Sequence, residues 1–122
     1  MNSTRSRRVD DGGSVTIEAA IALSVVVIVL AMCLAGIGCA IGEIRCVDAA
    51  REAARLAARG DGDQAAEVVA KLAPAEASLN LRVAGDTVIA TVTAVPVGGL
   101  LPAVRLTATA VAAKEPTANA EP

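Results

Sequence analysis

The sequence predicts an α+β protein with one long N-terminal helix, a short second helix and a small three-stranded antiparallel sheet. Three observations lead to this prediction. An apolar run without any charged residue extends over 19–42. Beyond it, apolar residues continue to recur at helical spacing as far as Gly60. After Pro74 the pattern changes to an alternation of apolar and polar residues, which is typical of half-buried strands.

The composition limits the classes of protein to which the chain can belong. Its 122 residues suffice for one small domain and one membrane segment. The chain is 54% hydrophobic, yet it has no Phe, Trp, Tyr or His. Because aromatic side chains bury the most area per residue, a water-soluble core built without them is thin and only marginally stable. The net charge of −2 and the dispersed basic residues give no basis for nucleic-acid binding.

The three cysteines, Cys33, Cys39 and Cys46, lie on or beside the apolar run. None of them is in CxxC spacing and no His is present, so we expect no metal site. A helix places Cys39 and Cys46 about 10 Å apart along its axis, beyond the roughly 7 Å that a disulfide allows. We therefore interpret them as small packing residues, with Cys46 as the candidate for a disulfide between subunits.

The apolar run is long enough to cross a membrane. As a helix, residues 19–42 span about 36 Å, which exceeds the roughly 30 Å of a hydrocarbon core and the length of secretory signal segments. The β-branched residues 25–29 favour a strand in water, but a backbone in lipid must satisfy its own hydrogen bonds, so a helix is expected. Small residues offer faces for the close approach of another helix, namely Ala31, Ala35, Gly36, Gly38 and Gly42.

The distribution of charge predicts the orientation of this helix. Arg5, Arg7 and Arg8 precede the run, and the positive-inside rule places such residues in the cytoplasm. The arginines after the run are interleaved with acidic residues on a continuing helix, so we give them less weight. The N-terminus is thus expected in the cytoplasm and the C-terminal part outside.

The helix is expected to continue through 43–59 and to end at Gly60, with a total length of about 45 residues or roughly 70 Å. Its apolar stripe in this second half is predicted to comprise Ile44, Val47, Ala50, Ala54, Ala57 and Ala58.

A short helix and three strands are predicted after Gly60. Asp63 is expected to cap a helix over Gln64–Leu72, and Pro74 to end it. Alternation predicts strands over 79–83, 88–95 and 104–112, with Gly85 and Asp86 in the first turn and a longer loop before the third strand. The domains predicted from these elements are a cleaved cytoplasmic leader (1–13), a transmembrane and assembly helix (14–42), an external helix-plus-sheet domain (43–113) and a disordered tail (114–122).

Glu18 is the residue that most constrains the function. It lies near the start of the apolar stretch 15–42, and a charged side chain inside a bilayer costs about 2.5–3.5 kcal/mol on insertion scales. If the chain were cut between Gly13 and Ser14, Ser14 would carry a new positive amine and Glu18 would be the fifth residue. When helices pack side by side, the carboxylate of one subunit can then meet the amine of its neighbour.

The residues Gly13-Ser14-Val15-Thr16-Ile17-Glu18, between an Arg-bearing leader and an unbroken apolar helix, resemble the processing site of type IV prepilins. A prepilin peptidase cuts such chains after the Gly, and the Glu at the fifth position serves subunit packing. Within that group, the runs Ser14–Leu23 and Cys46–Gly60 are similar to the actinobacterial branch of the TadE family. Major Flp pilins usually have a Tyr after the Glu and are shorter, whereas Ala19 follows Glu18 here, which favours a minor subunit.

The resemblance implies a minor pilin or pseudopilin of a tight-adherence (Flp) type IV pilus or a related secretion system. Its expected partners are a prepilin peptidase, other pilins or pseudopilins, the pilus assembly platform and the lipid bilayer. It implies a single-pass protein of the plasma membrane, and it leaves open whether the subunit enters a surface pilus. No cofactor is implied.

Three alternatives remain on the sequence alone. In a generic single-pass anchored protein, Glu18 would merely reach toward the lipid headgroups. In a lipoprotein, cleavage would occur before Cys39, which follows a small residue. An enzyme is the least favoured class, since the external part lacks a nucleophile with an evident base.

Overall fold

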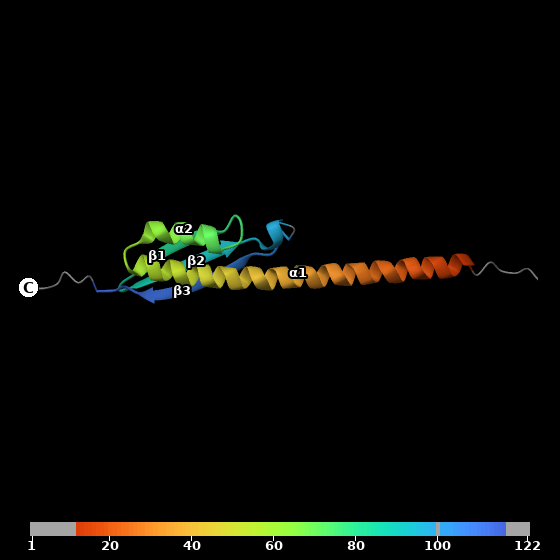
Figure 1. Cartoon of the computed structure of the whole chain (residues 1–122). Coiled ribbons are helices and arrows are strands. Elements are labelled where there is room, and N and C mark those ends of the chain that lie inside the picture. The colour runs from red at the N-terminus through yellow and green to blue at the C-terminus, as the bar shows by residue number, and fades with distance from the viewer. Residues whose placement is uncertain (1–11, 100, 117–122) are drawn as a thin grey trace, which may run out of the picture. The chain divides into compact units, whose positions relative to one another are not determined.

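The computed structural model describes residues 12–99 and 101–116 of the chain. In chain order these form α1 (Gly12–Ala58), α2 (Gly62–Leu72), β1 (Ser78–Ala84), β2 (Thr87–Ala94), the 3-10 helix η1 (Pro96–Gly99) and β3 (Leu106–Ala113) (Figure 1). The predicted α+β fold, with its long helix, short helix and three-stranded antiparallel sheet, is confirmed. The chain divides into two compact units at Leu34/Ala35, so α1 contributes to both.

Helix α1 has 47 residues, corresponding to about 70 Å. It begins at Gly12, so Gly13 and Ser14 already lie in its first turn. It ends at the predicted glycine, because Gly60 adopts φ +94°, a conformation that side chains disfavour. The Gly60 N–H donates to Ala57 O at 3.1 Å and the Asp61 N–H to Leu56 O at 3.0 Å, the two hydrogen bonds of a Schellman motif.

Helix α2 begins earlier than predicted. Its N-cap is Asp61, without a side-chain capping hydrogen bond, so the expectation that Asp63 caps the helix is wrong. Asp63 lies in the first turn instead, where its negative charge is favourable near the helix N-terminus. The helix ends before Pro74 as predicted, with the Ala73 N–H donating to Val69 O at 2.9 Å.

The sheet has the order β1-β2-β3, with both pairs antiparallel. Gly85, with φ +61°, and Asp86 connect β1 to β2 as predicted. Leu79 lies opposite Val92, and Val92 lies opposite Ala108, so these side chains share one face of the sheet. The 3-10 helix η1 lies within the segment predicted only as a loop.

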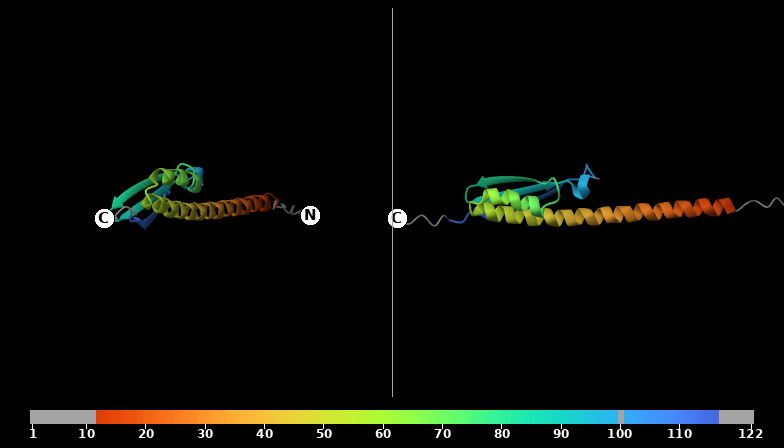
Figure 2. Two further views of the ribbon diagram at one scale, coloured as in Figure 1. Left: turned by 60° about the vertical axis from the view of Figure 1, so that its left-hand side comes forward. Right: turned by 45° about the horizontal axis from the view of Figure 1, so that its top comes forward.

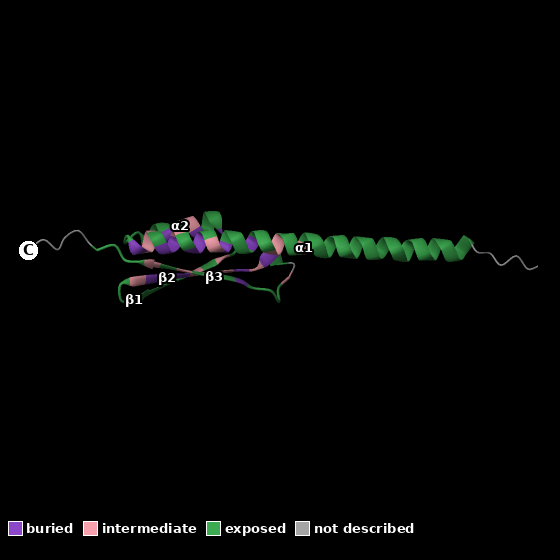
Figure 3. Cartoon of the chain, turned by 90° about the horizontal axis from the view of Figure 1, so that it is seen from below, coloured by how far each residue is buried: buried purple, intermediate pink, exposed green. Residues whose placement is uncertain are grey.

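The second half of α1 lies against the sheet, as the views of Figures 1 and 2 agree. The core consists almost entirely of small side chains, and Figure 3 shows the buried residues of α1 confined to this half. From the helices they are Cys46, Ala49, Ala50, Ala53, Ala54, Ala65 and Val69, and from the strands Ala90, Val92, Ala94, Leu106 and Ala108.

The predicted apolar stripe of α1 is only partly right. Ala50, Ala54 and Ala58 are buried, but Ile44 is 62% exposed. The buried stripe is rotated toward a set of small residues that the prediction missed, namely Cys46, Ala49 and Ala53. A short side chain lets the helix backbone approach the sheet closely. The face of α1 that packs on the sheet is therefore the one with the smallest side chains, and hydrophobicity alone does not distinguish it from the neighbouring faces.

Gly42 marks the closest approach between α1 and the rest of its unit. A Cβ at this position would lie 2.6 Å from Leu106 Cδ1 and 3.9 Å from Pro74 Cγ. Since real Cβ atoms do not approach other atoms to 2.6 Å, only glycine fits without rearrangement. This residue is therefore used inside its own chain and is not free for a neighbouring helix, contrary to its prediction as part of such a face.

The first unit has no core of its own. Every residue of α1 from Gly12 to Leu34 is exposed, and the large apolar side chains of this segment are 53–69% exposed. By length and composition α1 is the one helix in the described part of the chain that could cross a membrane. The structure thus supports a single-pass membrane protein in the coarse sense that one such helix is present.

Candidate assembly and membrane-anchoring site

The first two turns of α1 carry the three residues predicted to direct processing and assembly. Gly13, Ser14 and Glu18 are all exposed. Ser14 and Glu18 are four residues apart, so they lie on one face of the helix and about 6 Å apart along its axis. The structure therefore brings these two residues together, while the arginines of the leader lie outside the described residues.

The polar side chains of the apolar helix differ in whether they have a hydrogen-bond partner within the chain. Thr16 Oγ1 donates to Gly12 O at 2.9 Å, and Ser24 Oγ donates to Ala20 O at 2.8 Å. Such bonds to the preceding turn allow hydroxyl side chains to enter an apolar environment. Among the residues that the structure describes, Glu18 has neither a hydrogen bond nor an ion pair from its carboxylate. In lipid it needs a partner from elsewhere.

Apart from the hydroxyl side chains of Ser14, Thr16 and Ser24, the helix surface around Glu18 is apolar. The exposed large residues of this half include Val15, Ile17, Ile21, Leu23, Val25, Val26, Val27, Ile28, Val29, Leu30, Met32 and Leu34. A continuous apolar surface of this extent is typical of a segment covered by lipid or by other helices. A Cβ added at Gly36 would meet no atom within 4 Å, so a neighbouring backbone has room to approach there.

Cys46 is not available for the predicted disulfide between subunits. Its side chain is 0% exposed, in contact with the core under the sheet. Burial raises the pKa of its thiol, and the nearby Glu43 carboxylate raises the pKa further. A buried thiol with a raised pKa is a poor nucleophile. Cys46 is therefore a packing residue of the second unit, as the cysteines were interpreted, and its candidacy for a disulfide between subunits is wrong.

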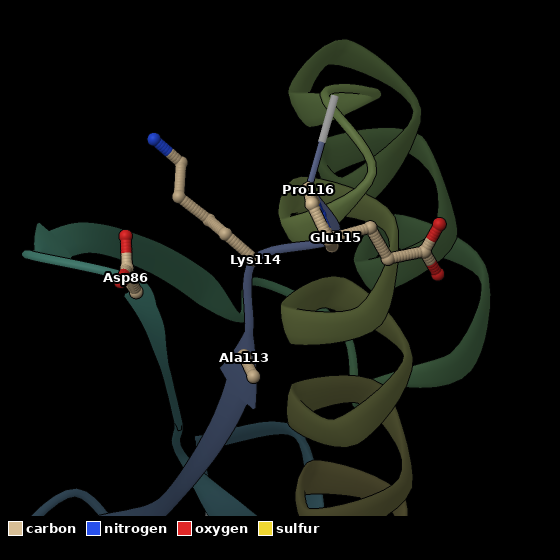
Figure 4. Close-up of a pocket in the computed structure, with 5 residues that line it drawn as sticks. All are labelled: Asp86, Ala113, Lys114, Glu115 and Pro116. Atoms are coloured by element: carbon tan, nitrogen blue, oxygen red, sulfur yellow. The ribbon is translucent and has the colours of Figure 1, made fainter. Parts of the chain in front are cut away.

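A shallow hollow lies where the end of the sheet meets the end of α1, lined by Asp86, Ala113, Lys114, Glu115 and Pro116 (Figure 4). The Lys114 N–H donates to Asp86 O at 2.7 Å, and the Glu115 N–H donates to Ala58 O at 3.3 Å. Figure 4 shows the side chains of Asp86 and Lys114 on one side and that of Glu115 directed away from them.

Beside this hollow, residues of the C-terminal segment contact the end of α1. The Arg59 Nε donates to Glu115 Oε1 at 3.2 Å, so the first residues of the predicted tail are attached to the domain, while 117–122 lie outside the described residues. The hollow contains no nucleophile beside a general base, which acyl or phosphoryl transfer would need. Within the described ranges no three His, Cys, Asp or Glu side chains cluster to hold a metal ion.

Comparison with known proteins shows one relative over most of the chain. It is the apoptosis inhibitor Rv3655c of Mycobacterium tuberculosis (strain ATCC 25618 / H37Rv), which is 46% identical over 103 residues, or 84% of this chain and 81% of the relative. The chain belongs to the family of this mycobacterial protein. No family model matches the chain, and no solved structure matches it.

The length of this match shows which parts of the chain the family shares. The 103 matched residues are more than the second unit, Ala35–Pro122, contains. The similarity therefore includes part of the chain upstream of Ala35 as well as the helix-plus-sheet unit. The match to the mycobacterial relative thus takes in part of the exposed helix and most of the helix-plus-sheet unit.

Proposed function

We propose that this chain is a minor pilin or pseudopilin of a tight-adherence (Flp) type IV pilus or a related secretion system. It inserts into the plasma membrane with its N-terminus in the cytoplasm, a prepilin peptidase removes residues 1–13, and the mature helix packs against the helices of other subunits. One observation carries the proposal: Glu18 is an exposed carboxylate without a partner in the described residues, and it is the one charged residue over 12–42.

The proposed role of Glu18 follows from the energies involved. Two unit charges 4 Å apart attract by about 4 kcal/mol at the effective dielectric constant near a protein surface. This attraction is comparable to the roughly 2.5–3.5 kcal/mol that an ionised side chain costs inside a bilayer. Pairing with the Ser14 amine of a neighbouring subunit therefore offsets the cost of placing Glu18 in lipid. Because the amine exists only after cleavage, assembly waits for processing.

Replacement of Glu18 tests the pairing. Glu18→Ala should be cleaved normally, since the scissile bond is unchanged, but should be lost from complexes with the partner pilins. The readout is co-purification with those subunits from native membranes. Glu43→Ala is the matched control, because Glu43 is an exposed carboxylate on the same helix beyond the apolar run. Normal incorporation of Glu18→Ala would contradict the pairing.

Replacement of Gly13 tests the cleavage site. Gly13→Leu should block removal of the leader, whereas Gly12→Leu, one residue earlier, should leave cleavage after Gly13 intact. The two variants are compared by the mass of the chain recovered from cells with an active prepilin peptidase. Efficient cleavage of Gly13→Leu at the same bond would refute the proposed site.

The alternatives differ from the proposal in the mature N-terminus. A generic membrane-anchored protein keeps its leader. A lipoprotein starts at an acylated Cys39, which would cut α1 just before Gly42, where the helix contacts Leu106. That cut would also remove the apolar helix that the family shares, so we favour cleavage after Gly13.

The name of the mycobacterial relative supports a second candidate function, the inhibition of apoptosis. Under this candidate the chain acts by binding, since the described residues contain no nucleophile beside a base. The test is caspase activation in cultured cells that are treated with an inducer of apoptosis and with the purified full chain. Unchanged caspase activation would remove this candidate without affecting the assembly proposal.

A further inference from the structure

The segment between β2 and β3 has no polar side chain over ten residues, 95–104. Loops that face water are usually rich in Asn, Asp and Ser, whose side chains hydrogen-bond to the backbone and to solvent. Here the second part of the loop is a turn closed by the Val104 N–H and Leu101 O at 3.0 Å. Pro102 and Ala103 at the middle of this turn are exposed, and Val104 is 40% exposed.

This loop lies beside the last turns of the charge-free run of α1. One hollow of about 220 Å³ is lined together by α1, by the connection after α2 and by η1, through Gly38, Ile41, Gly42, Arg45, Pro74, Ala75 and Pro96. All of these residues belong to the unit that begins at Ala35. Figures 1 and 2 show the loop after β2 projecting beyond the sheet at the end where α1 enters this unit.

The opposite end of the same unit is polar. There Arg59 Nε and Glu115 Oε1 form an ion pair at 3.2 Å, and Asp86 and Lys114 line the hollow of Figure 4. The charged residues nearest the apolar loop in sequence or on its neighbouring elements are Glu43, Arg45, Glu76 and Arg105, all exposed. The unit therefore has one charged end and one end with an apolar loop bordered by two arginines and two glutamates.

We propose that the turn 101–104 rests in the surface of the outer membrane leaflet and forms a second membrane contact beside α1. The run 19–42 is about 36 Å long as a helix and the hydrocarbon core about 30 Å thick, so the helix turn that ends at Gly42 lies at headgroup depth. Pro96 of η1 lines one hollow with Gly42, so η1 lies at the same depth, and the turn 101–104 follows η1 in the same loop. Its apolar side chains enter the acyl boundary, while Arg45 and Arg105 extend toward lipid phosphates.

This proposal rests on the proposed function in one respect, that α1 spans the bilayer with the second unit outside. Its consequence is orientational. With α1 alone in the bilayer the second unit can tilt relative to the membrane surface, whereas a second contact at headgroup depth restrains that tilt. Entry into a fibre then requires the turn to leave the lipid.

Tryptophan fluorescence tests the proposal directly, because the natural chain contains no Trp. Three full-length variants are reconstituted in vesicles of phosphatidylcholine and phosphatidylglycerol, with or without bromine on the acyl chains, which quenches indole emission. Ala103→Trp reports on the turn. Ala113→Trp, also an exposed alanine but at the charged end, is the matched control. Leu23→Trp reports on the helix itself.

We expect brominated lipid to reduce the emission of Ala103→Trp about twofold or more, since interfacial segments lie roughly 5–10 Å into the headgroup and acyl boundary. Leu23→Trp should be quenched as well, and Ala113→Trp should be unaffected. Quenching at Leu23→Trp alone would overturn the second contact and leave the membrane helix intact. Absence of quenching at Leu23→Trp would overturn both this inference and the proposed function.

Discussion

Individual residues on α1 are distinguished mainly by the size of their side chains. Gly42 approaches Leu106 so closely that a Cβ would collide with it, whereas at Gly36 nothing lies within 4 Å. Both glycines occur in the same apolar run and look equivalent in the sequence. The first is required by the packing of its own chain, and the second remains open to another helix.

This difference predicts opposite outcomes for two matched substitutions. Gly42→Leu should lower the free energy of unfolding of the second unit by about 1–3 kcal/mol, the usual cost of overpacking. Gly36→Leu should leave it unchanged. Both are measured by denaturant titration of the full chain in detergent micelles. Equal effects of the two variants would show that α1 does not pack on Leu106 through Gly42.

The burial of Cys46 predicts the reactivity of its thiol. In a background with Cys33→Ala and Cys39→Ala, Cys46 should react with a maleimide only when the chain is unfolded, because its side chain is 0% exposed. A cysteine placed at the 62% exposed Ile44, with Cys46→Ala, should react rapidly in the folded chain. Rapid labelling of native Cys46, or a disulfide-linked dimer that depends on it, would contradict the packing described above.

The same thiol predicts a pH dependence. Its pKa is raised in the folded chain, first by burial and then by the Glu43 carboxylate. Its contribution to stability is therefore fully present below the ordinary thiol pKa and is lost as the pH rises through the raised value. The free energy of unfolding should fall over this alkaline range more steeply for the natural chain than for Cys46→Ala. Identical slopes would exclude this contribution.

Among the elements, the strands were predicted best from the sequence. Alternation identified β2 as a strand, in which Val88, Ala90, Val92 and Ala94 are all buried. Three features could not be predicted. The packed stripe of α1 depends on which alanines face the sheet, and alanine is common on both faces. The N-cap of α2 is Asp61 where Asp63 was predicted, and η1 is a short turn of helix without a distinguishing pattern.

A strained turn between α2 and β1 yields a prediction at the scale of elements. Glu76 has φ +63°, a conformation that costs a non-glycine residue roughly 1–3 kcal/mol, and the Ala77 N–H donates to Pro74 O at 3.3 Å across the turn. Glu76→Gly should therefore raise the free energy of unfolding by about 1 kcal/mol. Ala75→Gly, at the preceding position, should lower it by up to about 1 kcal/mol. Thermal unfolding that ranks the two variants in the reverse order would contradict this turn.

For the whole molecule, some features follow from the sequence alone and others appear only in the folded structure. The sequence alone predicted the long helix, the three-stranded sheet and the lone charge of Glu18 within the apolar helix, because charge and periodicity are visible along a chain. It wrongly placed Gly42 on a face for neighbouring helices and left Cys46 open as the candidate for a disulfide between subunits. The contacts of both residues within the chain depend on residues far away in sequence, such as Leu106. The apolar end of the second unit likewise became visible only in the structure, where η1, the connection after α2 and α1 lie together.

The central claim is that the chain is processed after Gly13 and assembled through Glu18. The most direct test of its first step is the intact mass and N-terminal sequence of the protein recovered from native membranes. We predict a mature chain that begins at Ser14. A chain that still begins at Met1, in cells with an active prepilin peptidase, would contradict the account, as would one that begins at an acylated Cys39.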